Sequence, residues 1–298
     1  MNQHRTLTLP DGRSLGFADF GHPTGVPLFY FHGTMSSRLE ARLLDLAARD
    51  VGVRLIAVDR PGMGLSTWHE ARSLRSWADD VSHLANHLRL ERFGVAGWSG
   101  GGAYAAAVAS VLGDRVTRLT LIAPQAPREA IRTISGRPLL IQLFEGLTQW
   151  TTLHLLITAW IIGRVLAWRG SALFRALPHA LFCQADRRLL ASAAFSAALA
   201  DAWGEGLICG TRGAAHDVAL LLRPWDFVPG GMTCPVDIIC GADDKLCPPS
   251  YARWFSTQCA GASLTIVPEA GHLHIADAAA FIVAPHALAT VARARAVR

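Results

Sequence analysis

Residues 94–109, GVAGWSGGGAYAAAVA, place a single serine, Ser99, among glycines between an apolar run and an alanine-rich run. The apolar run predicts a buried strand and the alanine-rich run predicts a helix. Gly97 and Gly101 lack the Cβ atoms that would clash in a tight turn between the two. This strand-turn-helix setting is the one that G-x-S-x-G requires, with the serine held out at the carboxyl edge of a sheet. Ser99 is therefore a candidate nucleophile.

Strand and helix patterns alternate on both sides of this turn. RTLTL and SLGFADFG alternate in polarity around Asp11-Gly12, which predicts an antiparallel hairpin. PLFYF, VRLIAVD, RFGVAG, VTRLTLIAP, PVDIIC and SLTIV are strand-like runs, and the most apolar of them do not alternate, which is typical of parallel strands buried on both faces. Helix-period segments lie between them, at residues 36–50 and 73–90 for example. The pattern predicts an α/β fold with a mostly parallel, doubly wound sheet after an N-terminal antiparallel hairpin.

The alternation of strand and helix patterns stops between residues 125 and 230, where helix-like segments rich in Leu, Ala and Trp occur without a clear strand. Five of the nine tryptophans lie there: Trp150, Trp160, Trp168, Trp203 and Trp225. We therefore expect residues 1–124 and 231–298 to form one core, with residues 125–230 inserted as a helical lid.

Composition excludes several classes of function. With 298 residues, 51% of them hydrophobic, the chain can bury a large core. The net charge of +5 does not indicate nucleic-acid binding, because Lys245 is the single lysine and the arginines are spread along the chain. The six cysteines form no C-x-x-C pair and are expected to be small buried hydrophobes rather than a disulfide or metal framework.

The chain is expected to be cytoplasmic and without stable membrane insertion. Its N-terminus lacks the apolar segment of a signal peptide. The most membrane-like stretch, residues 153–168, has an unbroken apolar part shorter than the roughly 20 residues that a spanning helix needs, and it contains Arg164. A buried or lid helix is the favoured interpretation.

Five motifs together make the chain resemble the α/β-hydrolase family over residues 7–124 and 234–294. They are Phe31-His32-Gly33-Thr34, Asp59-Arg60-Pro61-Gly62-Met63-Gly64-Leu65-Ser66, the serine turn, Gly241-Ala242-Asp243-Asp244 with Pro248, and Gly271-His272. The resemblance implies a triad of serine, acid and histidine in that chain order.

The resemblance assigns the histidine and the acid to late loops. His272 follows a strand in a Gly-His turn from which a loop could bring its imidazole to Ser99 as general base, and His274 is the fallback. The family pattern G-x-x-D-x-x-x-P falls on Gly241, Asp244 and Pro248, so Asp244 is the implied acid. Asp243 is its competitor, with a turn-stabilising role as the alternative.

The same resemblance implies two backbone N–H groups that stabilise an oxyanion. One is that of Gly100, and the other belongs to Thr34 or Gly33. His32 is expected to shape its loop, and the segment from Asp59 to Ser66 to form a structural turn near the site. Candidate contacts for substrate are Trp98, Met35, Trp150 and Trp160.

These expectations predict a serine hydrolase, with no cofactor or metal, that cleaves an ester or thioester of an apolar small molecule. The lid's Trp and Leu content favours a bulky apolar substrate. The same scaffold also hosts carbon-carbon bond hydrolases, lyases, acyltransferases and cyclases of natural-product pathways, and no residue of the sequence excludes them. A binding protein that has lost catalysis would be expected to lack a triad residue, whereas all three are present.

Overall fold

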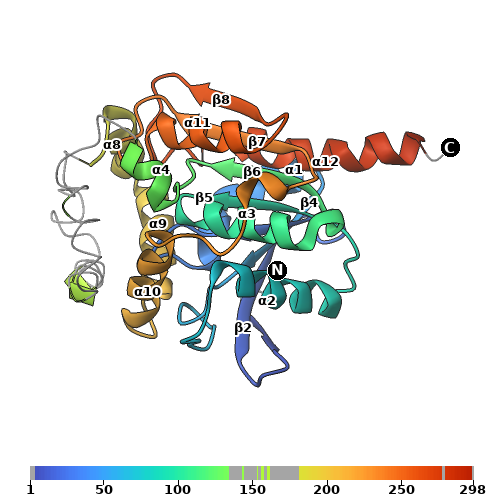
Figure 1. Ribbon diagram of the computed structural model, residues 1–298, viewed down its shortest axis with the longest axis horizontal. Helices are drawn as coiled ribbons and strands as arrows, with labels where there is room; N and C mark the ends of the chain where they lie inside the picture. The colour runs from blue at the N-terminus through green and yellow to red at the C-terminus, as the bar shows by residue number, and fades with distance from the viewer. Residues whose placement is uncertain are drawn as a thin grey trace.

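The computed structural model describes residues 4–133, 181–276 and 279–296, together with positions 143, 153, 156, 157, 160 and 161. In this part of the chain one eight-stranded sheet has helices on both faces (Figure 1). The strands are β1 (Arg5–Thr8), β2 (Ser14–Gly21), β3 (Val26–Phe31), β4 (Val53–Val58), β5 (Phe93–Trp98), β6 (Val116–Ile122), β7 (Val236–Gly241) and β8 (Ser263–Val267).

The strand order is β1-β2-β4-β3-β5-β6-β7-β8. Strand β2 runs antiparallel to β1 and β4, and every later pair is parallel. The predicted fold class, a mostly parallel sheet that begins with an antiparallel hairpin, is confirmed. Because β5 lies in the middle of the order, the turn that follows it opens at the centre of the carboxyl edge.

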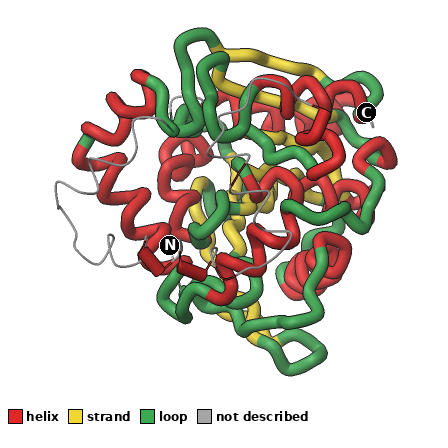
Figure 2. The backbone as a smooth tube through the Cα atoms, turned by 60° about the vertical axis from the view of Figure 1, so that its left-hand side comes forward, coloured by secondary structure: helices red, strands yellow, loops and turns green. Residues whose placement is uncertain are grey.

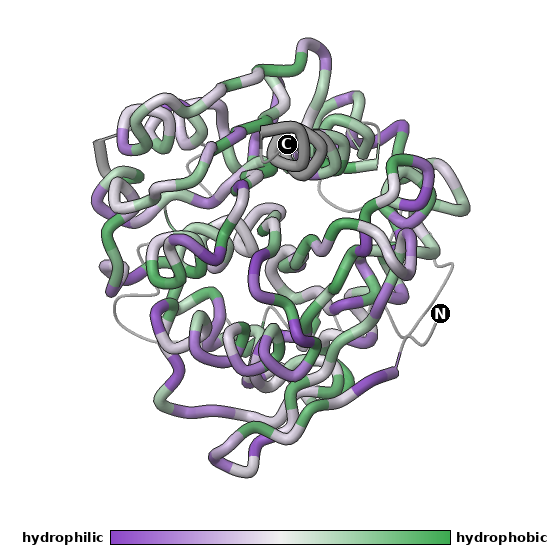
Figure 3. Tube along the Cα trace, turned by 90° about the vertical axis from the view of Figure 1, so that its right-hand side faces the viewer, coloured by the Kyte–Doolittle hydropathy of each residue, from purple (hydrophilic) through white to green (hydrophobic). Residues whose placement is uncertain are grey.

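Two layers of helix bury both faces of the sheet. Phe29 and Phe31 of β3 pack in one cluster with α2 (Leu74–His87), α3 (Gly100–Leu112) and α11 (Pro249–Gln258). Leu28 and Tyr30 point the other way, into a cluster with α1 (Asp45–Asp50) and α12 (Ala279–Ala296). Figure 2 shows helices and loops around the central strands, and Figure 3 shows that the outer helices carry both hydrophilic and hydrophobic residues. This double burial explains the strand runs that do not alternate.

The segment after β3 differs from the regular helix that its periodicity predicts. A 3-10 helix, η1 (Arg38–Leu44), precedes the short α1. Tertiary contacts explain this departure from a regular α-helix, because two charged side chains of η1 point into the core. Arg38 is bound by the Asp59 carboxylate, and Glu40 accepts the hydroxyl hydrogen of Tyr30. Ser37 caps the first turn by accepting the N–H of Leu39.

The described residues between β6 and β7 include helices, connecting loops and no strand. The helices are α4 (Arg128–Thr133), α8 (Gln184–Ala191), α9 (Ala193–Gly206), α10 (Arg212–Leu221) and the 3-10 turn η3 (Pro229–Gly231). Helices α8, α9 and α10 form a column at one end of the sheet, on the left of Figure 1. A Cβ on Gly206 would lie 2.3 Å from the Ser36 carbonyl oxygen, and one on Gly213 would lie 2.1 Å from that of Gly62. These helices therefore rest on the loops that follow β3 and β4.

Four of the six cysteines are buried, as predicted for small apolar residues, and Cys234 is half-buried. Cys209 is exposed, contrary to the prediction, because it lies in the turn between α9 and α10. Among the described residues, no helix has the length and apolar character needed to cross a bilayer.

Candidate active site

Ser99 stands in a strained turn between β5 and α3. Its backbone has φ 55° and ψ −122°, a conformation that side-chain-bearing residues rarely adopt, and its N–H donates to the Ile122 carbonyl at 2.8 Å. A Cβ on Gly97 would lie 2.2 Å from the carbonyl oxygen of Gly101, so the turn closes only with glycine there. The half-buried Ser99 side chain is thereby held at the carboxyl edge of the sheet.

The structure brings Ser99, His272 and Asp244 into one hydrogen-bonded chain. His272 Nε2 lies 3.0 Å from Ser99 Oγ, and His272 Nδ1 lies 2.8 Å from Asp244 Oδ2. The other Asp244 oxygen accepts the N–H groups of Leu246 at 2.9 Å and Cys247 at 2.8 Å. Because a carboxylate only accepts, Nδ1 carries the hydrogen and Nε2 is left to accept the serine hydroxyl. The three side chains thus have the connectivity of nucleophile, base and acid.

Backbone contacts between two loops place Asp244 opposite His272. The Ala242 N–H donates to Val267 and the Asp243 N–H to Ala270, each at 2.9 Å. A Cβ on Gly241 would lie 2.3 Å from the Ala270 carbonyl oxygen, so the close approach of the loops requires glycine. Asp243 is exposed, whereas Asp244 is buried.

The buried His272 has its pKa moved by opposing effects. Burial disfavours the imidazolium, but the Asp244 carboxylate outweighs burial through its charge and its hydrogen bond, and the pKa is raised above its ordinary value. Asp186 and Glu40 raise the pKa of His272 further through their charges. The ring is therefore a strong base aimed at Ser99.

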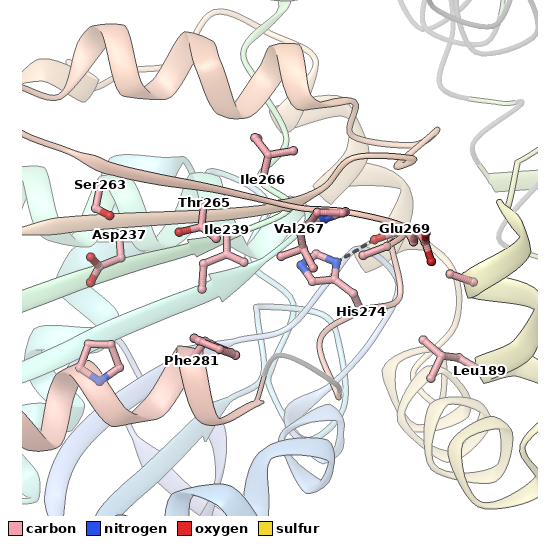
Figure 4. A pocket seen from close by; sticks show the side chains of 15 residues that line it. Leu189, Asp237, Ile239, Ser263, Thr265, Ile266, Val267, Glu269, His274 and Phe281 are labelled. Atoms are coloured by element: carbon pink, nitrogen blue, oxygen red, sulfur yellow. Dashed lines mark hydrogen bonds between the residues drawn. The ribbon is translucent and has the colours of Figure 1, made fainter.

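His274, the alternative histidine, lies on the far side of the same loop. Its Nδ1 donates to the Gly271 carbonyl at 2.7 Å, and burial lowers its pKa. Figure 4 shows His274 in a cavity of about 500 Å³ that lies between β7, β8, α8 and α12. Ser99 does not line this cavity. His274 is therefore a packing residue that shapes the His272 loop.

One of the two proposed oxyanion donors beside His32 is already occupied. The Gly33 N–H donates to Glu40 Oε1 at 2.9 Å, so this N–H already has an acceptor within the protein. Thr34 lies next to Gly100, because a Cβ on Gly100 would be 2.5 Å from Thr34 Oγ1. Within the part of the chain that the structure describes, the N–H groups of Thr34 and Gly100 donate to no other protein group.

Glu40, which sequence reasoning missed, is a buried carboxyl behind this loop. Its Oε1 accepts the Tyr30 hydroxyl at 2.6 Å as well as the Gly33 N–H. Burial raises its pKa to about 7. His32 shapes the same loop, as expected, because its Nδ1 donates to the Gly33 carbonyl at 2.8 Å and its ring is fully buried.

The four residues predicted to contact substrate have different positions. Trp98 is buried and supports His272 instead, because its indole N–H donates to the His272 carbonyl at 3.1 Å and its ring lies against the imidazole. Met35, half-buried with φ 62°, follows Thr34. Trp160 is 59% exposed. Trp150 lies outside the described residues.

A second buried group that the sequence did not reveal joins α10 to the core. The Asp217 carboxylate accepts from Arg60 at 2.8–3.2 Å and from the Tyr104 hydroxyl at 2.6 Å. Arg60 also donates to the Gly33 carbonyl at 2.9 Å. Burial raises the pKa of Asp217, but the Arg60 and Arg72 guanidinium groups outweigh it and hold that pKa below its ordinary value. The motif around residue 60 thus anchors α10 to the candidate oxyanion loop.

The sequence matches the model of the alpha/beta hydrolase family over residues 27–284. The chain belongs to the alpha/beta hydrolase family. The match includes all three residues of the hydrogen-bonded chain. Among curated proteins, the dihydrolipoyllysine-residue acetyltransferase component of the acetoin cleaving system of Pseudomonas putida is 36% identical over 121 residues. That region is 40% of this chain and 32% of that protein, so the chain spans about a third of that relative's length.

Solved structures of hydrolase-fold proteins superpose over nearly the whole chain. The bromoperoxidase from Bacillus anthracis has a TM-score of 0.72 at 18% identity, over 96% of this chain and 99% of that one. The enol-lactonase from Burkholderia xenovorans LB400 has a TM-score of 0.68 at 18% identity, over 95% and 99%. A thermophilic esterase from Thermogutta terrifontis has a TM-score of 0.63 at 20% identity, over 98% and 97%. At these identities the likeness establishes the shared fold.

Proposed function

We propose that this hydrolase-family chain is a serine hydrolase that cleaves an ester or thioester of an apolar small molecule through an acyl-enzyme. The observation that carries the proposal is the hydrogen-bonded chain from Ser99 Oγ through His272 to Asp244, in which each contact is 3.0 Å or shorter. A glycine turn that strains the serine supports the same role, as do the N–H groups of Thr34 and Gly100, which have no acceptor among the described residues.

The first half of the reaction transfers the acyl group to the enzyme. Ser99 Oγ attacks the substrate carbonyl carbon while its proton passes to His272 Nε2. Asp244 stabilises the imidazolium that forms. The carbonyl oxygen becomes an oxyanion that accepts hydrogen bonds from the N–H groups of Thr34 and Gly100. The intermediate collapses as His272 returns the proton to the leaving oxygen or sulfur, which departs as the alcohol or thiol.

The second half releases the acid. A water molecule gives its proton to His272 Nε2 and attacks the acyl carbon, and the same two N–H groups stabilise the new oxyanion. His272 then returns the proton to Ser99 Oγ as the ester bond to the serine breaks. The net reaction consumes one water, and His272 carries the proton in each transfer.

Apolar side chains around the candidate oxyanion site support an apolar substrate. A Cβ on Gly100 would lie 2.7 Å from Leu221 Cδ1 at the end of α10, so a leucine borders the Gly100 backbone. Met35 and Leu207 pack against a small cluster formed by Met63 and Ala214. We infer that residues 125–230 act as a lid whose end forms part of the substrate pocket.

Labelling of the serine tests the proposal. A fluorophosphonate should label the parent chain once, at Ser99, and should not label Ser99→Ala. Ser256→Ala, which removes a half-buried serine of α11, is the matched control and should label like the parent. The parent should also hydrolyse p-nitrophenyl esters, at rates that depend on acyl length. A folded chain that is labelled elsewhere, or not at all, refutes the assignment of Ser99.

The likeness to a protein named as an acetyltransferase component favours one second candidate, acyl transfer to an acceptor other than water. The acyl-enzyme would be the same, and only the second nucleophile would differ. Adding an alcohol or a thiol to the p-nitrophenyl ester assay would then raise turnover and give the transfer product in place of the free acid.

A further inference from the structure

A carboxyl from the inserted helices binds the loop that carries His272. Asp186, in the first turn of α8, is fully buried, and its Oδ1 accepts the N–H of Leu273 at 2.7 Å. The two residues are 87 positions apart in the sequence. This bond holds the loop one residue beyond His272.

The same carboxyl packs against the residue before His272. A Cβ on Gly271 would lie 2.2 Å from Asp186 Oδ2 and 2.4 Å from the carboxyl carbon. The position is glycine because the Asp186 carboxyl occupies the space that a side chain would fill. Asp186 thus contacts both neighbours of His272 from one side, whereas Asp244 contacts the imidazole itself.

Helix capping alone does not account for this arrangement. Asp186 also accepts the N–H of Cys183 and so completes a capping box at the start of α8, but that bond is 3.3 Å long. The bond to Leu273 is shorter by 0.6 Å and crosses to another element. A residue needed only for capping would not have to be buried against the His272 loop.

Four titratable groups surround His272 on the elements packed against it. They are Asp244 after β7, Glu40 in η1, His274 on its own loop and Asp186 in α8. His274 is neutral at pH 7, because burial lowers its pKa. The charge of the Asp186 carboxylate acts on His272 and raises the pKa of its imidazole.

We propose that Asp186 is a positioning residue for His272, which holds the loop on both sides of the imidazole and favours the imidazolium formed when Ser99 attacks. The proposal rests on the proposed function of the Ser99 site. Under this proposal the segment between β6 and β7 positions the catalytic histidine as well as covering the active site. The Asp186 charge raises the pKa of His272, which agrees with this role.

The test separates charge from shape. Asp186→Asn keeps an oxygen that can accept from Leu273 and removes the charge. The pKa of the His272 imidazole, followed by NMR in a Ser99→Ala background, should fall by roughly half a unit or more. In the presence of Ser99, kcat for p-nitrophenyl ester hydrolysis should fall about tenfold, because the imidazolium is less stable and the loop less well held. Asp50→Asn, which removes an exposed carboxyl at the end of α1, is the control and should change neither value.

Gly271→Ala is the second variant, for use if Asp186→Asn does not fold. Its new Cβ must displace the Asp186 carboxyl while the charge remains, so kcat should fall with a smaller change in the His272 pKa. An unchanged His272 pKa in folded Asp186→Asn overturns the proposal, even where the rate falls. If the parent neither hydrolyses esters nor reacts with a fluorophosphonate, the proposed function fails instead, and the NMR titration still decides the role of Asp186.

Discussion

Replacing Asp244 with asparagine should almost abolish hydrolysis without changing the shape of the site. Asp244 Oδ1 accepts two backbone N–H groups, from Leu246 and Cys247, and Oδ2 accepts the hydrogen on His272 Nδ1. An asparagine keeps both backbone bonds only when its amide oxygen takes the Oδ1 position. Its NH₂ group then faces His272, where an acceptor is needed.

The consequence is the wrong tautomer of the base. Facing an NH₂ donor, Nδ1 of His272 must accept, so the ring hydrogen moves to Nε2, which lies 3.0 Å from Ser99 Oγ and can no longer take the serine proton. The charge that stabilised the imidazolium is lost as well. The triad template indicates a loss on the order of 10⁴ in kcat, equivalent to about 5.5 kcal/mol of transition-state stabilisation.

The assay is p-nitrophenyl ester hydrolysis by the parent, Asp244→Asn and Asp243→Asn, after thermal melts show that all three are folded. Asp243 is exposed, and its backbone N–H, which asparagine retains, makes its bond to Ala270. Asp243→Asn should therefore stay within a few-fold of the parent. If Asp243→Asn is inactive and Asp244→Asn is active, the geometry of the site does not describe the working enzyme.

Two further predictions concern pH and stability. His272 must be neutral at Nε2 to accept the serine proton, and its pKa is raised above the ordinary value of 6.5. The value of kcat/KM should therefore fall as pH decreases through a pKa above 6.5. A rate that is independent of pH between 5 and 9 would contradict this role. Asp217→Ala leaves the buried Arg60 guanidinium without its carboxylate and should lower the free energy of unfolding by about 3 kcal/mol or more, measured by urea titration. An unchanged urea midpoint would show that this pair does not anchor α10.

Local patterns in the sequence determined the sheet and the serine turn. Strand runs such as PLFYF are apolar at every position. Successive side chains of such a strand point to opposite faces of the sheet, and helices cover both faces, so every side chain is buried. Gly97 reveals the turn at Ser99, because a Cβ there would lie 2.2 Å from the Gly101 carbonyl oxygen four residues later. Gly101 is restricted by the packing of α3 on the sheet instead, because a Cβ there would lie 2.1 Å from the Phe31 carbonyl oxygen of β3. Short spacings were equally informative at the loop of Asp244, where the proposed acid, its N–H donors and Pro248 lie within five residues.

Only the tertiary structure decided which buried polar groups support the site. Asp186 binds Leu273 across 87 residues, and Asp217 binds Arg60 across 157. Each contact joins two single residues that lie far apart in the sequence, so it produces no periodic pattern. A lone aspartate in a helix-like segment cannot be told from a charged residue that faces solvent. The N–H of Gly33 is taken by Glu40 for the same kind of reason, since only the inward turn of η1 brings that carboxyl to the loop. Sequence patterns report what each segment must bury, whereas the partner of a buried charge is set by how the segments pack.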